Sequence, residues 1–167
     1  MVAPWYVKLL VVIWLPSALA GLWFARQQEL TDYLTSQQDY AYLDTTAVTA
    51  IWQDALVNHA RSEGLVAYVI SQEGCRCNAV AENHIQSLKQ VPAMQVEWVT
   101  PDYFPIQAPA FPTLVVMSEG ELVYFGAVGS GPMCINAGLE NFLIQQNSQS
   151  RKQFWLNTVV KGCFCHR

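Results

Sequence analysis

The residues most able to do chemistry in this sequence are five cysteines, four of which form two closely spaced pairs. Cys75 and Cys77 make up the first pair, and Cys163 and Cys165 make up the second, each in the pattern Gly-Cys-x-Cys. Cys134 is the odd thiol. Thiolates attack disulfides and also bind zinc or copper(I), so the pattern predicts either redox or metal chemistry.

The first cysteine pair lies between an apolar run and a helical segment. Residues 65–70 read LVAYVI, which is typical of a central strand covered on both faces. Residues 79–91 carry apolar side chains at helical spacing, and Pro92 ends the segment. The positive end of a helix and the neighbouring Arg76 both favour thiolate over thiol. We therefore expect Cys75 and Cys77 to be a redox pair that closes a small, easily reduced disulfide ring. The alternative is two separate thiols, or disulfides to Cys134 or to the C-terminal tail that carries Cys163 and Cys165.

The other predicted elements of the domain must position the first cysteine pair. Asp44 caps a predicted helix over residues 45–61, which Gly64 ends. A half-buried strand is predicted near residues 94–99, because apolar and polar side chains alternate there. Residues 113–125 predict a β-hairpin with its turn at residues 118–121. A last helix is expected over residues 136–146.

This order of elements resembles the thioredoxin-like family over residues 64–146. The cysteine turn before a helix and Phe111-Pro112-Thr113 at the start of a strand match best. The resemblance implies an α/β fold of three layers, with a central mixed sheet of about four strands flanked by helices. It also implies that Pro112 is a cis-proline beside the cysteines, and that Phe111 and Thr113 contact the substrate. A cis X–Pro bond is rare enough to indicate a specific role.

The cysteine motif departs from that of the family. Gly-Cys-Arg-Cys stands where Trp-Cys-x-x-Cys is usual, and Asn78 occupies the place of the second family cysteine. The chain thus resembles a membrane-anchored branch with a Cys-x-Cys motif. The resemblance implies that Cys75 is the nucleophile and that Cys77 resolves the mixed disulfide, with Arg76 and Pro112 supporting them.

The N-terminus is strongly apolar. Residues 9–25 carry no charge and, extended by residues 2–6, are long enough to span a membrane, with aromatic residues at both ends. Lys8 before the span and the acidic residues after Arg26 favour a domain on the outer side. The alternative is a cleaved signal peptide, since Ala18-Leu19-Ala20 has the form of a cleavage site. Both alternatives export the domain, so we expect an inner-membrane protein whose domain faces the periplasm or exterior, where disulfides persist.

Four segments follow from these features. They are an anchor or signal at residues 1–25, a tether at 26–43, a thioredoxin-like domain at 44–147 and a C-terminal extension at 148–167. The 167 residues carry a net charge of −4 without a basic block, which argues against nucleic-acid binding. We expect protein thiols or disulfides as partners, and no cofactor beyond a redox-active disulfide.

The C-terminal pair leaves three alternatives open. In the first, Cys163 and Cys165 are a second dithiol that exchanges with Cys75 and Cys77 as a resolving or relay pair, with Cys134 as a further candidate. In the second, both pairs form a zinc or copper site, with His84 or His166 as further ligands. In the third, the tail cysteines make a structural bridge, with Cys134 as a candidate partner. The sequence thus predicts thiol–disulfide exchange, with a metal-binding module or a non-catalytic interaction domain as alternatives.

Overall fold

The computed structural model describes residues 5–28, 30–35, 42–56, 64–104, 107–131, 138–149 and 152–166. The helices are α1 (Trp5–Gln28), α2 (Thr45–Leu56), α3 (Cys77–Leu88) and α4 (Leu139–Ser148), with a short 3₁₀ helix at Pro101–Tyr103. The strands are β1 (Thr31–Asp32), β2 (Leu65–Ile70), β3 (Met94–Val99), β4 (Thr113–Ser118), β5 (Glu121–Ala127), β6 (Trp155–Asn157) and β7 (Lys161–Gly162). Cys134 and His59, both singled out in the sequence, lie outside the described residues.

The main sheet is mixed and has five strands in the order β3-β2-β4-β5-β6. The pairs β2–β3 and β5–β6 are parallel, and β2–β4 and β4–β5 are antiparallel. The predicted hairpin is therefore present as β4 and β5. The fifth strand, β6, comes from the segment assigned to a C-terminal extension, so this segment is part of the sheet. A separate ladder joins β1, in the tether, to β7, in the tail.

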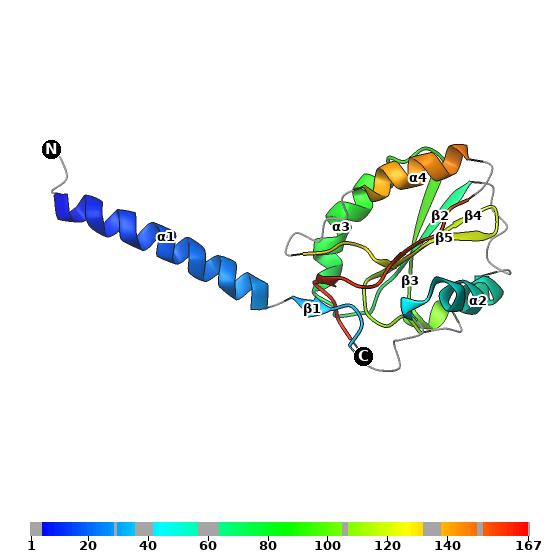
Figure 1. Cartoon of the computed structure of the whole chain (residues 1–167), viewed down its shortest axis with the longest axis horizontal. Helices are drawn as coiled ribbons and strands as arrows, with labels where there is room; N and C mark the ends of the chain where they lie inside the picture. The colour runs from blue at the N-terminus through cyan, green and yellow to red at the C-terminus, as the bar shows by residue number, and fades with distance from the viewer. Residues whose placement is uncertain are drawn as a thin grey trace.

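Alternate residues of the central strands face opposite layers. Val66, Tyr68 and Ile70 of β2 pack in one cluster with the buried α2 residues Val48 and Trp52. The intervening β2 residues pack in a second cluster with α3 and α4. Because side chains alternate along β2, both faces of this strand are buried. The helices cover the sheet on its two faces, as Figure 1 shows.

Helix boundaries differ from the expected ones by a few residues. Helix α3 begins at Cys77, two residues before the predicted start, because the N–H of Asn78 already donates to the Cys75 carbonyl. It ends at Leu88. Helix α4 begins at Leu139, after Gly138 in the left-handed conformation, and runs to Ser148.

The cysteine turn lies at the end of the sheet where β2 ends and β4 begins, and we call this end the sheet edge. Strand β4 runs antiparallel to β2, so its first residue, Thr113, pairs with the last residue of β2, Ile70. On its other side Thr113 pairs with Ala127 at the end of β5. The turn after β2 and the residues before β4 are therefore neighbours at this edge.

Helix α1 matches the predicted apolar segment. Its stretch Trp5–Ala25 has a mean hydropathy of 1.9, and none of it is buried against the domain. Its 24 residues span about 36 Å, more than the ~30 Å of a bilayer core. The helix projects away from the domain (Figure 1), and its length and composition suffice to cross a membrane.

Candidate functional site: two disulfides at the sheet edge

A tight turn brings the first cysteine pair to the sheet edge. The N–H of Cys75 donates to the carbonyl of Gln72 at 3.2 Å, and the Asn78 side chain donates to the same carbonyl at 3.0 Å. Gly74 adopts a φ of +77°, which a residue with a side chain rarely adopts. Cys75 lies just before α3 and Cys77 is the first residue of the helix, and both are buried.

The cysteines are paired differently from the expected small ring. Cys75 is bonded to Cys165, and Cys77 is bonded to Cys163. The prediction of a Cys75–Cys77 bond is therefore wrong for this state of the protein. The physical reason is the fold, which carries the C-terminal segment across the same edge, within disulfide reach of both cysteines.

Three of the four sulfurs in the two disulfides form one compact group. The Sγ atoms of Cys75, Cys77 and Cys165 all lie within 4.8 Å of one another. A free thiolate on any of these residues would thus lie beside a disulfide that it does not belong to. A thiolate is the species that attacks a disulfide sulfur in thiol–disulfide exchange.

Pro112 lies beside this group, and the Phe111–Pro112 peptide bond is cis, as the resemblance implied. Cys75 Sγ lies 3.7 Å from the carbonyl oxygen of Phe111. Phe111, Pro112 and Thr113 are all buried. The fold therefore brings together the predicted residues Cys75, Cys77 and Phe111 to Thr113, while the predicted Arg76 is exposed.

The C-terminal segment runs beside Phe111 as a short antiparallel strand. The N–H of Phe111 donates to the carbonyl of Cys165, and the N–H of Cys165 donates to the carbonyl of Phe111, both at 2.8 Å. Further back in the tail, Lys161 accepts a bond from the N–H of Gly131 at 2.7 Å. The tail is thus held by backbone hydrogen bonds as well as by two disulfides.

Phe164 is a buried residue of the tail, with 7% of its surface exposed. Its buried neighbours are Tyr33, Ala110 and Ala127. The rings of Tyr33 and Phe164 meet edge to face at 5.2 Å. A Cβ at Gly162 would lie 2.9 Å from the Phe164 ring, so glycine at this position makes room for the aromatic side chain.

Tyr33 and Phe164 were not predicted as parts of the site. Tyr33 is fully buried, although it comes from the segment assigned to a polar tether. Its neighbours in the sequence gave no apolar periodicity, because β1 has only two residues. The tandem Gly-Cys-x-Cys pattern was the one sequence signal that linked Phe164 to the first cysteine pair.

The two described histidines are not part of the sulfur group. His84 lies on α3, with Nδ1 3.6 Å from a carboxylate oxygen of Glu140 on α4. Burial lowers the pKa of His84, and the nearby Glu140 carboxylate opposes this shift in part. His166 Nδ1 lies 3.4 Å from the carbonyl oxygen of Pro109. In the part of the chain that the structure describes, the group of possible metal-ligand atoms consists of the Cys75, Cys77 and Cys165 sulfurs, and neither histidine belongs to it.

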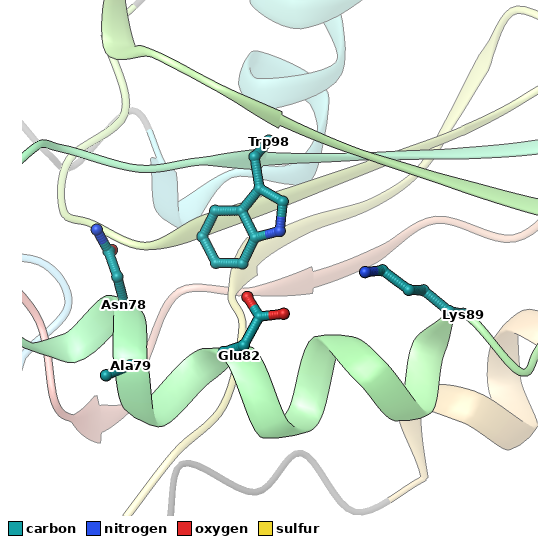
Figure 2. Close-up of a pocket in the computed structure, with 5 residues that line it drawn as sticks. All are labelled: Asn78, Ala79, Glu82, Lys89 and Trp98. Carbon is teal, nitrogen blue, oxygen red and sulfur yellow. The ribbon is translucent and has the colours of Figure 1, made fainter.

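An open pocket of about 580 Å³ begins one residue beyond Cys77. Its lining residues come from α3 and the edge strand β3, and they are Asn78, Ala79, Glu82, Lys89 and Trp98 (Figure 2). The Trp98 ring lies above the helix, with Glu82 below it and Lys89 to one side. The pocket is lined by the outer face of α3, whereas Cys77, Ile85 and Leu88 of the same helix are buried.

The fold and the site define a mixed α/β domain in which two disulfides bind the sheet edge to the C-terminal strand. Residues 45–167 match the sequence model of a family described as a domain of unknown function, DUF6436, and the chain belongs to that family. The match begins at the first residue of α2 and includes both cysteine pairs. No curated protein and no solved structure gave a significant match.

Proposed function

We propose that this protein carries out thiol–disulfide exchange on exported proteins through a relay of four cysteines. The observation that carries the proposal is the packing of three sulfurs, from Cys75, Cys77 and Cys165, within 4.8 Å of one another at the sheet edge. A disulfide placed next to further sulfurs can pass electrons by exchange over a very short distance.

We further propose that the domain is thioredoxin-like. The order of elements supports this, because α2 covers one face, and α3 and α4 cover the other. The antiparallel pairing of β2 with β4 also supports it, since it places Cys75 beside Phe111 and Pro112. The resemblance assigns the same neighbours to the redox site of that family.

In the proposed reaction, the thiolate of Cys75 attacks one sulfur of a partner disulfide. A bond forms between Cys75 and that sulfur, and the other partner sulfur leaves as a thiolate and takes a proton. The thiolate of Cys77 then attacks Cys75, which forms the Cys75–Cys77 bond and releases the partner as a dithiol. The partner gains two electrons, and the protein loses two.

Exchange with the tail then moves the disulfide of Cys75 from Cys77 to Cys165. The thiolate of Cys165 attacks Cys75, which forms the observed Cys75–Cys165 bond and releases Cys77 as a thiolate. Cys77 and Cys163 are then free to give up a second pair of electrons to another partner disulfide and close the second observed bond. The fully oxidised domain has therefore lost four electrons, and a dithiol reductant restores each pair by the reverse exchange.

The turn favours the attacking form of the cysteines. Cys75 and Cys77 lie at the N-terminus of α3, where unpaired N–H groups stabilise negative charge. Arg76 is exposed between them, so its charge is screened by solvent and adds a smaller effect. Burial of both cysteines also keeps the reaction away from bulk solvent.

We propose that α1 anchors the domain on the outer side of the inner membrane. The apolar stretch Trp5–Ala25 supports the anchor, and Lys8 before it supports an N-terminus inside. N-terminal sequencing of membrane-extracted protein tests this against signal cleavage. An intact residue 1 supports the anchor, whereas a new N-terminus after Ala20 rejects it.

The exchange reaction is tested with the full chain in detergent, a dithiol reductant and a dye-labelled glutathione disulfide. We expect turnover that Cys75→Ser/Cys77→Ser abolishes, and a trapped mixed disulfide with Cys77→Ser/Cys163→Ser/Cys165→Ser. Lys89→Ala, a change at the exposed residue that directly follows α3, is the matched control and should retain the wild-type rate. Absence of turnover in the wild type, with both disulfides intact, would favour the non-catalytic interaction domain.

A second candidate function is binding of a soft metal ion by the reduced protein. Four thiolates at Zn–S bonds of about 2.3 Å lie roughly 3.8 Å apart, and three of the sulfurs are already within 4.8 Å. The ligands would be Cys75, Cys77, Cys163 and Cys165. Titration of the reduced chain with zinc against a coloured chelator tests it: one ion per chain, lost in Cys163→Ser/Cys165→Ser, supports binding, and no uptake rejects it.

A further inference from the structure

The oxidised tail occupies the place from which any partner sulfur must approach Cys75. Cys165 Sγ is bonded to Cys75, and the backbone of Cys165 is paired with Phe111 through two hydrogen bonds. A partner cysteine that forms a mixed disulfide with Cys75 has to bring its sulfur to the same position. Its backbone then lies next to the N–H and C=O groups of Phe111, with which Cys165 pairs in the oxidised protein.

The side chain of the residue before Cys165 lies in a buried pocket of the domain. In the tail this residue is Phe164, which shares a buried cluster with the small side chains of Ala110 and Ala127 and with Tyr33, whose ring meets its own edge to face. Larger residues at these two alanine positions would fill the space that the ring takes. The pocket is thus shaped for an aromatic side chain that directly precedes a disulfide-bonded cysteine.

We propose that this surface binds an extended segment of a partner protein in which an aromatic residue directly precedes the reacting cysteine, and that Gly162–Cys165 is its built-in occupant in the oxidised protein. The inference rests on the proposed exchange reaction and names the class of substrate. The tail itself is the evidence for this choice, because the described residues show which side chain and which backbone direction the surface accepts.

Release of the tail requires more than one event. Either disulfide alone keeps the tail beside Phe111, so both Cys75 and Cys77 have to part from it. The tether also holds the tail, since β1 pairs with β7 and the Thr31 hydroxyl donates to the Phe164 carbonyl at 3.4 Å. Oxidised protein is therefore closed to partners, and a partner segment can compete with the tail for this surface once both disulfides are reduced.

The pocket is incomplete without the segment that follows α1. Tyr33 lies five residues beyond the end of that helix and forms one wall of the pocket. A partner segment bound here would lie against the membrane-proximal part of the chain. The experiment therefore uses the full chain in detergent.

The test compares two fluorescent peptides with the sequences Gly-Ser-Phe-Cys-His and Gly-Ser-Ala-Cys-His, each joined to glutathione through its cysteine. The protein variant is Cys77→Ser/Cys163→Ser/Cys165→Ser, in which Cys75 cannot be resolved by the other pair members. We expect the Phe peptide to form the mixed disulfide with Cys75 about tenfold faster or more, because buried aromatic anchors dominate such contacts. Equal rates for the two peptides would overturn the inference.

A second measurement does not depend on exchange. Gly-Ser-Phe-Ser-His, which has no thiol, should bind the same variant in fluorescence anisotropy, and adding Phe164→Ala should strengthen binding by emptying the pocket. Val159→Ala, at a tail residue that is 80% exposed, is the control and should leave binding unchanged. No gain from Phe164→Ala in a folded protein counts against the built-in occupant.

The two proposals fail in different ways. Exchange with both peptides at one rate rejects the aromatic pocket but keeps the exchange function. Binding of the thiol-free peptide without any mixed disulfide keeps the pocket but rejects the exchange function. A dimer of the oxidised chain, with tails exchanged between copies, would reject the claim that each tail occupies its own domain.

Discussion

The hydroxyl groups of Tyr33 and Thr113 are 2.6 Å apart and buried, although 80 residues separate them in the chain. Thr113 also donates to the carbonyl of Ala110, so its single proton is used there and Tyr33 is the donor to Thr113. This bond joins the segment after α1 to the first residue of β4, next to Pro112. The tether is therefore a wall of the site as well as a connection to α1.

Removal of the Tyr33 hydroxyl should destabilise the domain modestly. Tyr33→Phe is expected to cost about 1 kcal/mol, the usual net value of a hydrogen bond. Tyr33→Ala also removes the ring beside Phe164 and should cost about 3–5 kcal/mol. Urea unfolding of the full chain in detergent measures both values. Tyr6→Phe in α1 is the control, and a Tyr33→Ala protein as stable as the wild type would show that the tether does not pack as described.

Gly126 should not tolerate a side chain, because β6 passes directly over it. A Cβ there would lie 2.1 Å from the carbonyl oxygen of Asn157, and its φ is +143°. Gly138 also has a positive φ, +99°, but nothing lies within 4 Å of its Cβ position. Gly138→Ala should thus cost about 1–2 kcal/mol of backbone strain, whereas Gly126→Ala should cost a further ~1–3 kcal/mol for the clash.

Thermal unfolding of these two glycine variants separates strain from clash. The comparison is matched because both replace a glycine of positive φ by the same residue. A Gly126→Ala protein that is no less stable than Gly138→Ala would contradict the β5–β6 pairing.

Loss of one tail cysteine should rearrange the remaining bonds. In Cys163→Ser, Cys77 is a free thiol beside the Cys75–Cys165 disulfide, within the 4.8 Å group of sulfurs. We expect a mixture of Cys75–Cys165 and Cys75–Cys77 bonds after equilibration at neutral pH. Peptide mapping by mass spectrometry under non-reducing conditions detects both. Complete retention of Cys75–Cys165 would show that the sulfurs do not exchange.

Stability should fall as the pH drops below the ordinary range of histidine, because burial lowers the pKa of His84 in the folded state. The unfolded chain then binds a proton more readily than the folded chain does. This contribution to the free energy of unfolding is present above the unfolded-state pKa of about 6.5 and is lost as the pH falls toward the lower folded-state pKa.

Two variants test the origin of this pH dependence. In His84→Gln, the free energy of unfolding should decrease less than in the wild type as the pH falls below 7. Glu140→Gln removes the carboxylate that raises the His84 pKa, so the decrease should become steeper. An identical pH profile for Glu140→Gln and the wild type would mean that the carboxylate does not act on His84.

Much of the fold follows from local pattern. Six apolar residues at 65–70 predict a strand covered on both faces, and all six are buried. The apolar N-terminal run predicts a long exposed helix, and the hairpin follows from two strand patterns around Glu119-Gly120. These features depend on residues close together in the chain, which the sequence displays directly.

The sequence by itself determined that two Gly-Cys-x-Cys pairs exist, and that the first lies between a buried strand and a helix. Only the tertiary structure decided how they pair, because that depends on which backbone segments reach the same sheet edge. The bonds close over separations of 90 and 86 residues, after β6 has turned the tail toward Phe111. The same crossing buries Tyr33 and Phe164 together, since a side chain becomes part of a site through neighbours that are distant in the chain.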